Sequence, residues 1–211
     1  MDNTAKQIAE KLLQIKAIKL EPTNHFTWVS GWFSPIYCDN RKTLSYPEVR
    51  TFIKDSFVKV IKENFKDFDV IAGVATGAIA QGALVADALK KPFVYIRSQA
   101  KDHGLGNQIE GKLDAGQKVL IIEDLISTGG SSLSAAEAVR NAGCEVVGMV
   151  AIFTYNFQKS VDAFNEANVK LITLSNYNIL IEQALETGYI TNDEVELLNQ
   201  WRIAPDKWKK E

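Results

Sequence analysis

Apolar and polar residues alternate along the middle of the chain with two different periods. Short, almost continuously apolar runs predict buried strands, and the longer stretches between them, with an apolar residue at every third or fourth position, predict helices. The strands are expected at 69–74, 93–97, 118–123, 145–154 and 169–174, and the helices between them at 77–89, 131–141 and 160–167. This alternation predicts an α/β fold built on a doubly wound, mainly parallel five-stranded sheet.

The N-terminal part of the chain follows a different pattern. Capping-box pairs, Thr4 with Gln7 and Ser45 with Glu48, each precede an amphipathic stretch and predict the start of a helix. Between these helices, 18–38 is rich in turn, aromatic and β-branched residues, which is typical of short antiparallel strands. We therefore expect a small antiparallel hood near the N-terminus.

The C-terminal part predicts two closing helices, at 178–187 and 193–201, the second capped by Thr191 with Glu194. Neither a linker nor an internal repeat interrupts the chain. We expect one domain over residues 1–211, in which 1–45 forms the N-terminal helix and the hood.

The segment 98–117 has no clear periodicity, and its roughly 20 residues are more than a structural connection needs. Arg97 precedes it, and Lys101 and His103 lie within it. A solvated loop of mixed charge would explain any one of these cations. Together they favour a flexible active-site loop that closes over an anion.

Composition and charge narrow the possible partners. The formal net charge of −2 gives no general attraction to nucleic acid. Cys38 and Cys144 form no C-x-x-C pattern, which favours buried thiols in a reducing compartment over a disulfide or a zinc site. No apolar run has the length of a membrane span, and the N-terminus lacks the pattern of a signal peptide. We expect a cytoplasmic protein that binds neither nucleic acid nor membrane.

The richest chemistry lies in 119–132, where an apolar strand is followed by Glu123 and Asp124 and then by small hydroxylated residues and two glycines. The backbone N–H groups of 127–131, at the start of a predicted helix, suit an anion. The two carboxylates suit hydroxyl groups or a metal ion. A sugar phosphate is the ligand that matches both kinds of group.

Plainer interpretations compete with this one. An acidic pair before Gly-Gly could be an ordinary connection, but ionised carboxylates at the end of a buried strand need partners, which favours a binding site. The stretch 74–78 also follows a strand and opens a helix, so it is equally suited to binding phosphate and to close helix packing. Aromatic residues of the hood could stack on a flat ring, although a single one is more often plain core.

The stretch 119–132 resembles the phosphoribosyl diphosphate motif of the type I phosphoribosyltransferases. Other stretches resemble the members of that family that act on orotate, and the resemblance covers nearly the whole chain. These stretches are Phe26-Thr27-Trp28, Ser30-Gly31, Ser34 to Arg41, Arg97, Lys101 to Gly104 and Ile152 to Tyr155.

The resemblance implies a Mg²⁺-dependent enzyme of pyrimidine synthesis that transfers ribosyl 5-phosphate from phosphoribosyl diphosphate to orotate. It implies catalytic roles for Lys101, His103 and Asp124, contact of Ser127 with orotate, and no metal ligand supplied directly by the protein. It also implies a homodimer in which the loop reaches the neighbouring subunit's site. The residues implied to bind phosphoribosyl diphosphate are Arg97, Lys101, His103, Glu123, Asp124, Leu125, Ile126, Ser127, Thr128, Gly129, Gly130 and Ser131.

The chain departs from the family at positions near the acceptor base. Val29, Phe33 and Ser98 stand where members of the family often have lysine, so the anchor of the orotate carboxylate is left open. Arg41 is a candidate substitute for these lysines, although it matches no family position. His25, in a predicted turn, is expected at the surface. The alternatives are a transferase for a purine or uracil, and a phosphoribosyl diphosphate sensor with reduced catalysis.

Overall fold

The structure, a computed structural model, describes residues 3–28, 30–98 and 108–208. Its centre is a six-stranded sheet in the order β10-β9-β8-β5-β6-β7, whose first five strands in that order are mutually parallel. The strands are β5 (Val70–Val74), β6 (Phe93–Ile96), β7 (Ile109–Glu110), β8 (Lys118–Ile126), β9 (Glu145–Thr154) and β10 (Leu171–Asn176). The doubly wound α/β fold predicted from the sequence is confirmed.

The sixth strand, β7, was not predicted. It pairs antiparallel with β6 at the edge of the sheet, inside the segment that the sequence indicated only as a loop. A two-residue strand gives no periodic signal, and its partner residues Tyr95 and Ile96 supply the pairing that defines it.

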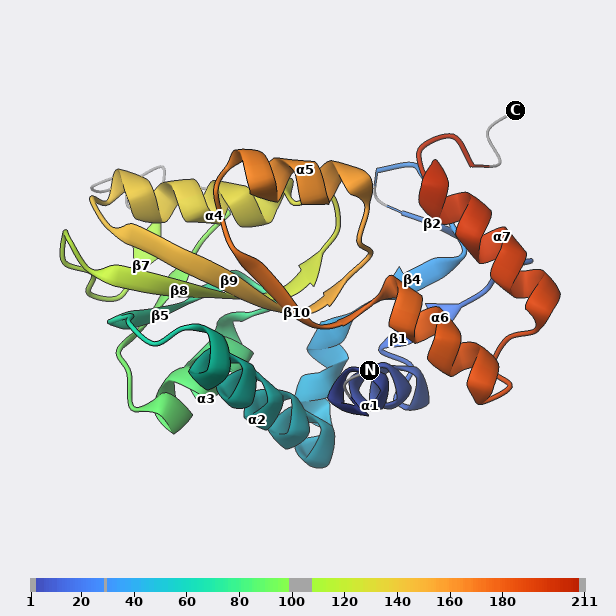
Figure 1. Ribbon diagram of the computed structural model, residues 1–211, viewed down its shortest axis with the longest axis horizontal. Helices are drawn as coiled ribbons and strands as arrows, with labels where there is room; N and C mark the ends of the chain where they lie inside the picture. Colours follow the sequence, from blue (N-terminus) through green and yellow to red (C-terminus); the bar gives the residue numbers. More distant parts are fainter. Residues whose placement is uncertain (1–2, 29, 99–107, 209–211) are drawn as a thin grey trace.

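Helices cover both faces of the sheet (Figure 1). In β8, Val119 and Ile121 belong to the core under one face, whereas Leu120 and Ile122 belong to the core under the other, as alternation along a strand requires. One face is covered by α4 (Gly130–Asn141) and α5 (Gln158–Glu166), and the other by α2 (Pro47–Asn64) and α3 (Ile79–Leu89).

The predicted antiparallel hood is present as two small ladders. Strand β1 (Ile18–Leu20) pairs with β4 (Ile36–Cys38), and β2 (Phe26–Thr27) pairs with β3 (Phe33–Ser34). A 3-10 helix, η1 (Asn40–Ser45), follows the hood and leads into α2.

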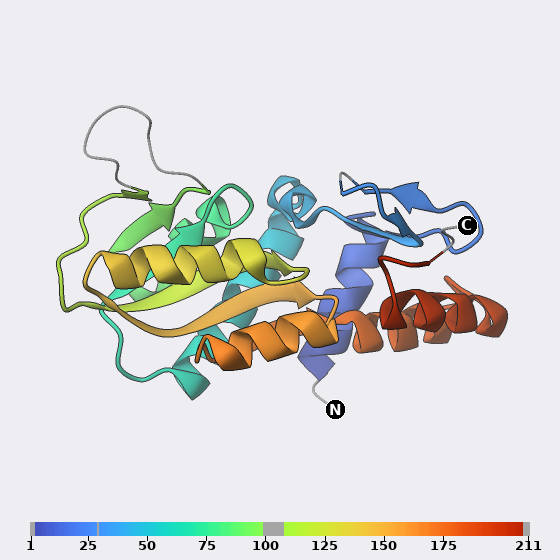
Figure 2. The same cartoon turned by 90° about the horizontal axis from the view of Figure 1, so that it is seen from above.

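The remaining helices lie beside the hood at one end of the molecule (Figure 2). Helix α1 (Asn3–Gln14) packs on α6 (Tyr177–Glu186), and α7 (Asn192–Ile203) follows α6. Both ends of the chain therefore contribute to the same region. Within the described residues, no helix combines the length and apolar character that crossing a membrane requires.

The predicted caps had different outcomes. The capping box of Thr191 with Glu194 is confirmed at the start of α7. The prediction for Ser45 with Glu48 is wrong, because Ser45 ends η1 and α2 starts at Pro47, whose fixed φ suits a first helical position. Thr4 is not a cap either, since α1 already includes Asn3.

Candidate active site

A polar cavity of about 440 Å³ lies at the carboxyl edge of the sheet, where the ends of β5 and β8 face the residues that follow β4. Parallel α/β sheets bind their ligands at this edge. The lining residues come from three stretches: Cys38, Asp39 and Arg41; Val74, Ala75, Thr76 and Gly77; and Glu123, Asp124, Leu125, Ser127, Thr128, Gly129 and Ser131. The structure thus brings together most of the predicted site between residues 123 and 131.

The two acidic residues of this cavity have different environments. They lie within β8, which continues to Ile126, rather than after its end. The Glu123 side chain is only 5% exposed; one carboxylate oxygen accepts the Asp124 backbone N–H at 2.9 Å and the other accepts the Ser132 hydroxyl at 2.8 Å. Burial, together with the neighbouring Asp124 carboxylate, raises the pKa of Glu123 well above its ordinary value. Glu123 therefore braces the turn into α4 through these two hydrogen bonds.

Asp124 is half-buried, and its carboxylate lies against the backbone of Gly77. A Cβ atom at position 77 would be 2.2 Å from Asp124 Oδ2, so the closeness of the β8 carboxylate to the stretch after β5 requires glycine there. The sequence left 74–78 open between phosphate binding and close packing. Gly77 is in fact closely packed, and it also lines the cavity.

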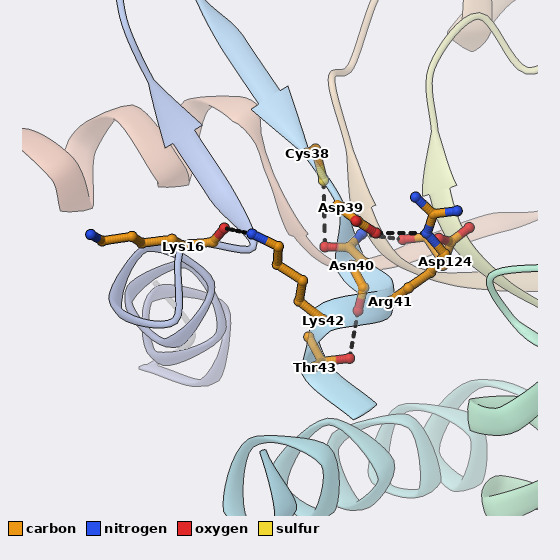
Figure 3. Close-up of polar contacts among 8 residues, drawn as sticks. All are labelled: Lys16, Cys38, Asp39, Asn40, Arg41, Lys42, Thr43 and Asp124. Atoms are coloured by element: carbon orange, nitrogen blue, oxygen red, sulfur yellow. Dashed lines mark hydrogen bonds and ion pairs between the residues drawn. The ribbon is translucent and has the colours of Figure 1, made fainter. Parts of the chain in front are cut away.

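Asn40 joins the hood to the acidic strand (Figure 3). Its side-chain amide donates to the backbone oxygen of Asp124 at 2.6 Å, and its Oδ1 accepts the Cys38 thiol at 3.4 Å. The Thr43 hydroxyl donates to the Asn40 backbone oxygen at 2.6 Å. Asn40 is 2% exposed and does not line the cavity, and its hydrogen bond holds the backbone of Asp124 in position. No role was predicted for it, because a single Asn in a loop carries no periodic signal.

Arg41 is the one basic side chain among the described residues that line the polar cavity. Its Nε donates to Asp39 Oδ1 at 2.7 Å, and this guanidinium lowers the pKa of the Asp39 carboxyl (Figure 3). The sequence suggested Arg41 as a substitute anchor for an orotate carboxylate. Its position favours the polar cavity instead.

The turn from β8 into α4 lies where the anion site is predicted. Gly129, at the N-cap of α4, has φ +88°, and a Cβ there would also lie 3.1 Å from the Phe164 ring, so both conformation and space require glycine. The first backbone N–H groups of an α-helix have no acceptor within the helix. With Ser127, Thr128 and Ser131 on the cavity wall, this helix start can bind phosphate.

A second cavity of about 320 Å³ adjoins the first and shares Cys38, Leu125 and Ser127 with it. Its other lining residues are Thr27, Trp28, Tyr37 and Tyr155. The Trp28 and Tyr155 ring centroids are 5.3 Å apart, and the Trp28 indole N–H donates to the backbone oxygen of Ile36 at 3.1 Å. This aromatic pocket suits a flat heterocycle next to a ribose held in the polar cavity.

Several predicted residues are not placed in either cavity. Arg97 is not among the described lining residues, and its guanidinium lies 3.5 Å from Glu110 on β7. Lys101, His103 and Val29 lie outside the described residues, so the structure does not test their roles.

His25 and Phe33 belong to the packing of the hood. The prediction that His25 lies at the surface is wrong: it is half-buried, its ring centroid lies 4.6 Å from that of Phe33 and 5.8 Å from that of Trp208, and its Nδ1 has no hydrogen-bond partner among the described residues. The C-terminal segment covers it. Phe33, at a position where members of the family often have lysine, packs on His25 and is not among the described residues that line the aromatic pocket.

The fold and the two cavities define a class: an α/β protein with a polar cavity suited to a sugar phosphate beside an aromatic pocket suited to a flat ring. A sequence model of the phosphoribosyl transferase domain matches residues 45–186. An orotate phosphoribosyltransferase of Porphyromonas gingivalis is 61% identical over 208 residues, 99% of each chain, and one of Listeria monocytogenes is 55% identical over 205 residues, 97% of this chain and 98% of that protein. The chain therefore belongs to the phosphoribosyltransferase family, within its orotate phosphoribosyltransferase group.

Solved structures agree with this assignment. A UMP synthase of Leishmania donovani matches with a TM-score of 0.78 and 27% identity, over 94% of this chain and 43% of that chain. An orotate phosphoribosyltransferase of Aeropyrum pernix has a TM-score of 0.76 and 24% identity, over 87% of this chain and 99% of that chain, which supports the fold alone.

Proposed function

We propose that the chain transfers the ribosyl 5-phosphate group of phosphoribosyl diphosphate to N1 of orotate, which yields orotidine 5′-phosphate and pyrophosphate. The observation that carries this proposal is the pair of adjoining cavities, one polar with an anion site and the other aromatic, joined at Ser127. The names of relatives at 55–61% identity support orotate as the acceptor.

The groups of the polar cavity divide the work. Backbone N–H groups at the start of α4 and the hydroxyls of Ser127, Thr128 and Ser131 bind the 5-phosphate. Asp124 accepts hydrogen bonds from the ribose hydroxyls, and its negative charge stabilises the positive charge that develops on the sugar as the bond to pyrophosphate breaks. Glu123 holds the turn in place from below.

Phosphoribosyltransferases generally use Mg²⁺ with phosphoribosyl diphosphate, and the oxygen-rich cavity is compatible with it. The described residues contain no group of three or more His, Cys, Asp or Glu side chains suited to a metal. Most ligands of the ion would therefore be oxygens of the substrate and water. When bound, Mg²⁺ would neutralise charge on the diphosphate.

The pyrophosphate end needs further positive charge. We assign this role to Arg97, Lys101 and His103, with Lys101 and His103 acting on the neighbouring site of a homodimer. Mixing subunits that carry Lys101→Ala with subunits that carry Asp124→Asn tests this arrangement. Activity should return in the mixture, because one of the two sites in a hybrid dimer then has both an intact loop and an intact Asp124.

The loss of orotate absorbance, in the presence of Mg²⁺ and phosphoribosyl diphosphate, tests the substrate assignment. Uracil, adenine and hypoxanthine serve as competing acceptors under the same conditions. We expect turnover of orotate alone. Consumption of another base with orotate untouched would contradict the assignment.

A further inference from the structure

The C-terminal helix α7 lies against the hood, although the two are about as far apart in sequence as the chain allows (Figure 2). Both lie outside residues 45–186, the part that matches the general transferase family. The residue that connects them is Trp201, whose side chain is fully buried. Its indole N–H donates to the backbone oxygen of Phe33 in β3 at 3.2 Å.

Trp201 also contacts two of the aromatic side chains that line the aromatic pocket, on the side away from the cavity. Its ring centroid lies 5.7 Å from that of Trp28, at an interplanar angle of 81°, and 5.8 Å from that of Tyr155, at 82°. Trp28 comes from the hood and Tyr155 directly follows β9, and among the described residues no strand pairing joins these two walls. Trp201 is not among the described residues that line the pocket.

The position of Trp201 is itself fixed by other rings. Its ring centroid lies 5.4 Å from that of Phe157 and 5.7 Å from that of Tyr177, and the Tyr177 hydroxyl donates to the backbone oxygen of Leu198 in α7 at 2.8 Å. The Phe157 pair is edge-to-face at 65° and the Tyr177 pair is tilted at 38°, and aromatic pairs favour defined distances and angles. Trp201 is thus a fixed support between the hood and the sheet.

The polar cavity is held by other contacts. Asn40 holds Asp124 through its backbone oxygen, and Ser132 holds Glu123; neither contact involves α7. A change at Trp201 should therefore move the aromatic wall without moving the phosphate site.

We propose that Trp201 is a positioning residue for the acceptor base. Helix α7 sets the spacing and tilt of Trp28 relative to Tyr155 through this side chain, and so sets the affinity for the base without touching it. This inference rests on the proposed function, since it presumes that the aromatic pocket binds orotate.

Two variants of Trp201 test the proposal. Trp201→Leu removes the ring and should raise the KM for orotate about tenfold, the upper range for the loss of an aromatic pair. Trp201→Phe keeps a ring but loses the N–H group, and should restore most of the affinity, to within about threefold of the wild type. In both variants the KM for phosphoribosyl diphosphate should stay within about twofold.

Phe57→Leu is the matched control for a general loss of stability. Phe57 is fully buried in α2, within the same core, but it lines neither cavity. The melting temperature of the Phe57→Leu variant should fall, while its KM values for orotate and for phosphoribosyl diphosphate stay unchanged. Ile203→Ala, at an 83% exposed position on α7, should change neither stability nor KM.

Three outcomes would overturn the inference: an unchanged orotate KM in Trp201→Leu, an equal rise of both KM values, or the same orotate-specific rise in Phe57→Leu. If Trp201→Leu fails to fold, the test rests on Trp201→Phe. In that case the proposal requires an orotate KM that is measurably higher in Trp201→Phe than in the wild type. The proposed function is tested separately, by turnover of orotate in the wild-type protein.

Discussion

The two adjoining cavities are built in opposite ways. The polar cavity takes its groups from the ends of neighbouring strands and from the turn that follows one of them, so that a single stretch, 123–131, supplies half of its wall. The aromatic pocket takes Trp28 from the hood and Tyr155 from the position directly after β9, with Trp201 of α7 behind both. One continuous stretch supplies half of the polar cavity, whereas the aromatic walls of the other pocket come from segments that lie far apart in the sequence.

This difference indicates how each site keeps its geometry. In the polar cavity, hydrogen bonds to backbone atoms and glycines at close contacts determine where each group lies, and a change of one atom has a direct chemical effect. In the aromatic pocket, ring packing determines the shape, and the effect of a substitution is spread over several ring contacts. Substitutions should therefore be severe at the first site and graded at the second.

The largest effect is expected for Asp124→Asn. Removing the charge that we propose to face the developing sugar cation should lower kcat about 10²- to 10³-fold. The fold should persist, because Asn40 bonds the backbone of Asp124 rather than its carboxylate. Turnover of orotate and thermal unfolding measure the two effects, with Asp162→Asn on α5 as a charge-matched control. A loss below about tenfold would place the decisive charge elsewhere.

Gly77→Ala should come next. The added Cβ would lie 2.2 Å from Asp124 Oδ2 and must push the carboxylate aside, which should cost about 10²-fold in kcat. The double mutant with Asp124→Ala separates the causes. If displacement of Asp124 is the mechanism, adding Gly77→Ala to Asp124→Ala lowers activity no further.

At the aromatic pocket, Trp28→Leu should raise the orotate KM about tenfold and leave the KM for phosphoribosyl diphosphate within about twofold. Trp32 stacks near Trp28, with centroids 6.5 Å apart, but is not among the described lining residues. Trp32→Leu is therefore the matched control, with a change below about threefold expected. Equal effects of the two substitutions would contradict the assigned pocket.

The smallest effect concerns stability and pH. Because the pKa of Glu123 is raised in the folded protein, the folded state holds this proton more tightly than the unfolded chain does. Stability should therefore fall as pH rises from the ordinary value of 4.5 through the raised pKa, and Glu123→Gln should flatten this decline. Urea unfolding at pH 5, 6.5 and 8 measures it. An unchanged slope in the variant would show that Glu123 is ionised when buried.

The sequence predicts the sheet well because each buried strand and amphipathic helix carries its own periodic signal. Residues 123–131 could be identified for a similar reason: carboxylates, hydroxyls and glycines at fixed spacing have few structural explanations. The edge strand Ile109–Glu110 is too short for any period to appear. Ser45 resembled a cap because its spacing to Glu48 is correct, but Pro47 set the helix start.

The contacts that the sequence did not predict are those between distant segments. Asn40 reaches Asp124 across 84 residues, and Trp201 reaches Phe33 across 168 residues. His25 was expected to be exposed because its neighbours form a turn, yet Trp208 covers it. A pattern within one segment does not indicate which other segment will pack on it.

The contact of Trp201 with the hood also bears on the order in which the protein is completed during synthesis. Residues 70–154, which supply the main strands of the phosphate site, leave the ribosome well before α7 does. The hood is synthesised before these strands, but Trp28 can pack on Trp201 only after α7 has been synthesised. A nascent chain that is truncated before α7 should therefore be able to form the phosphate site while the acceptor pocket is still incomplete.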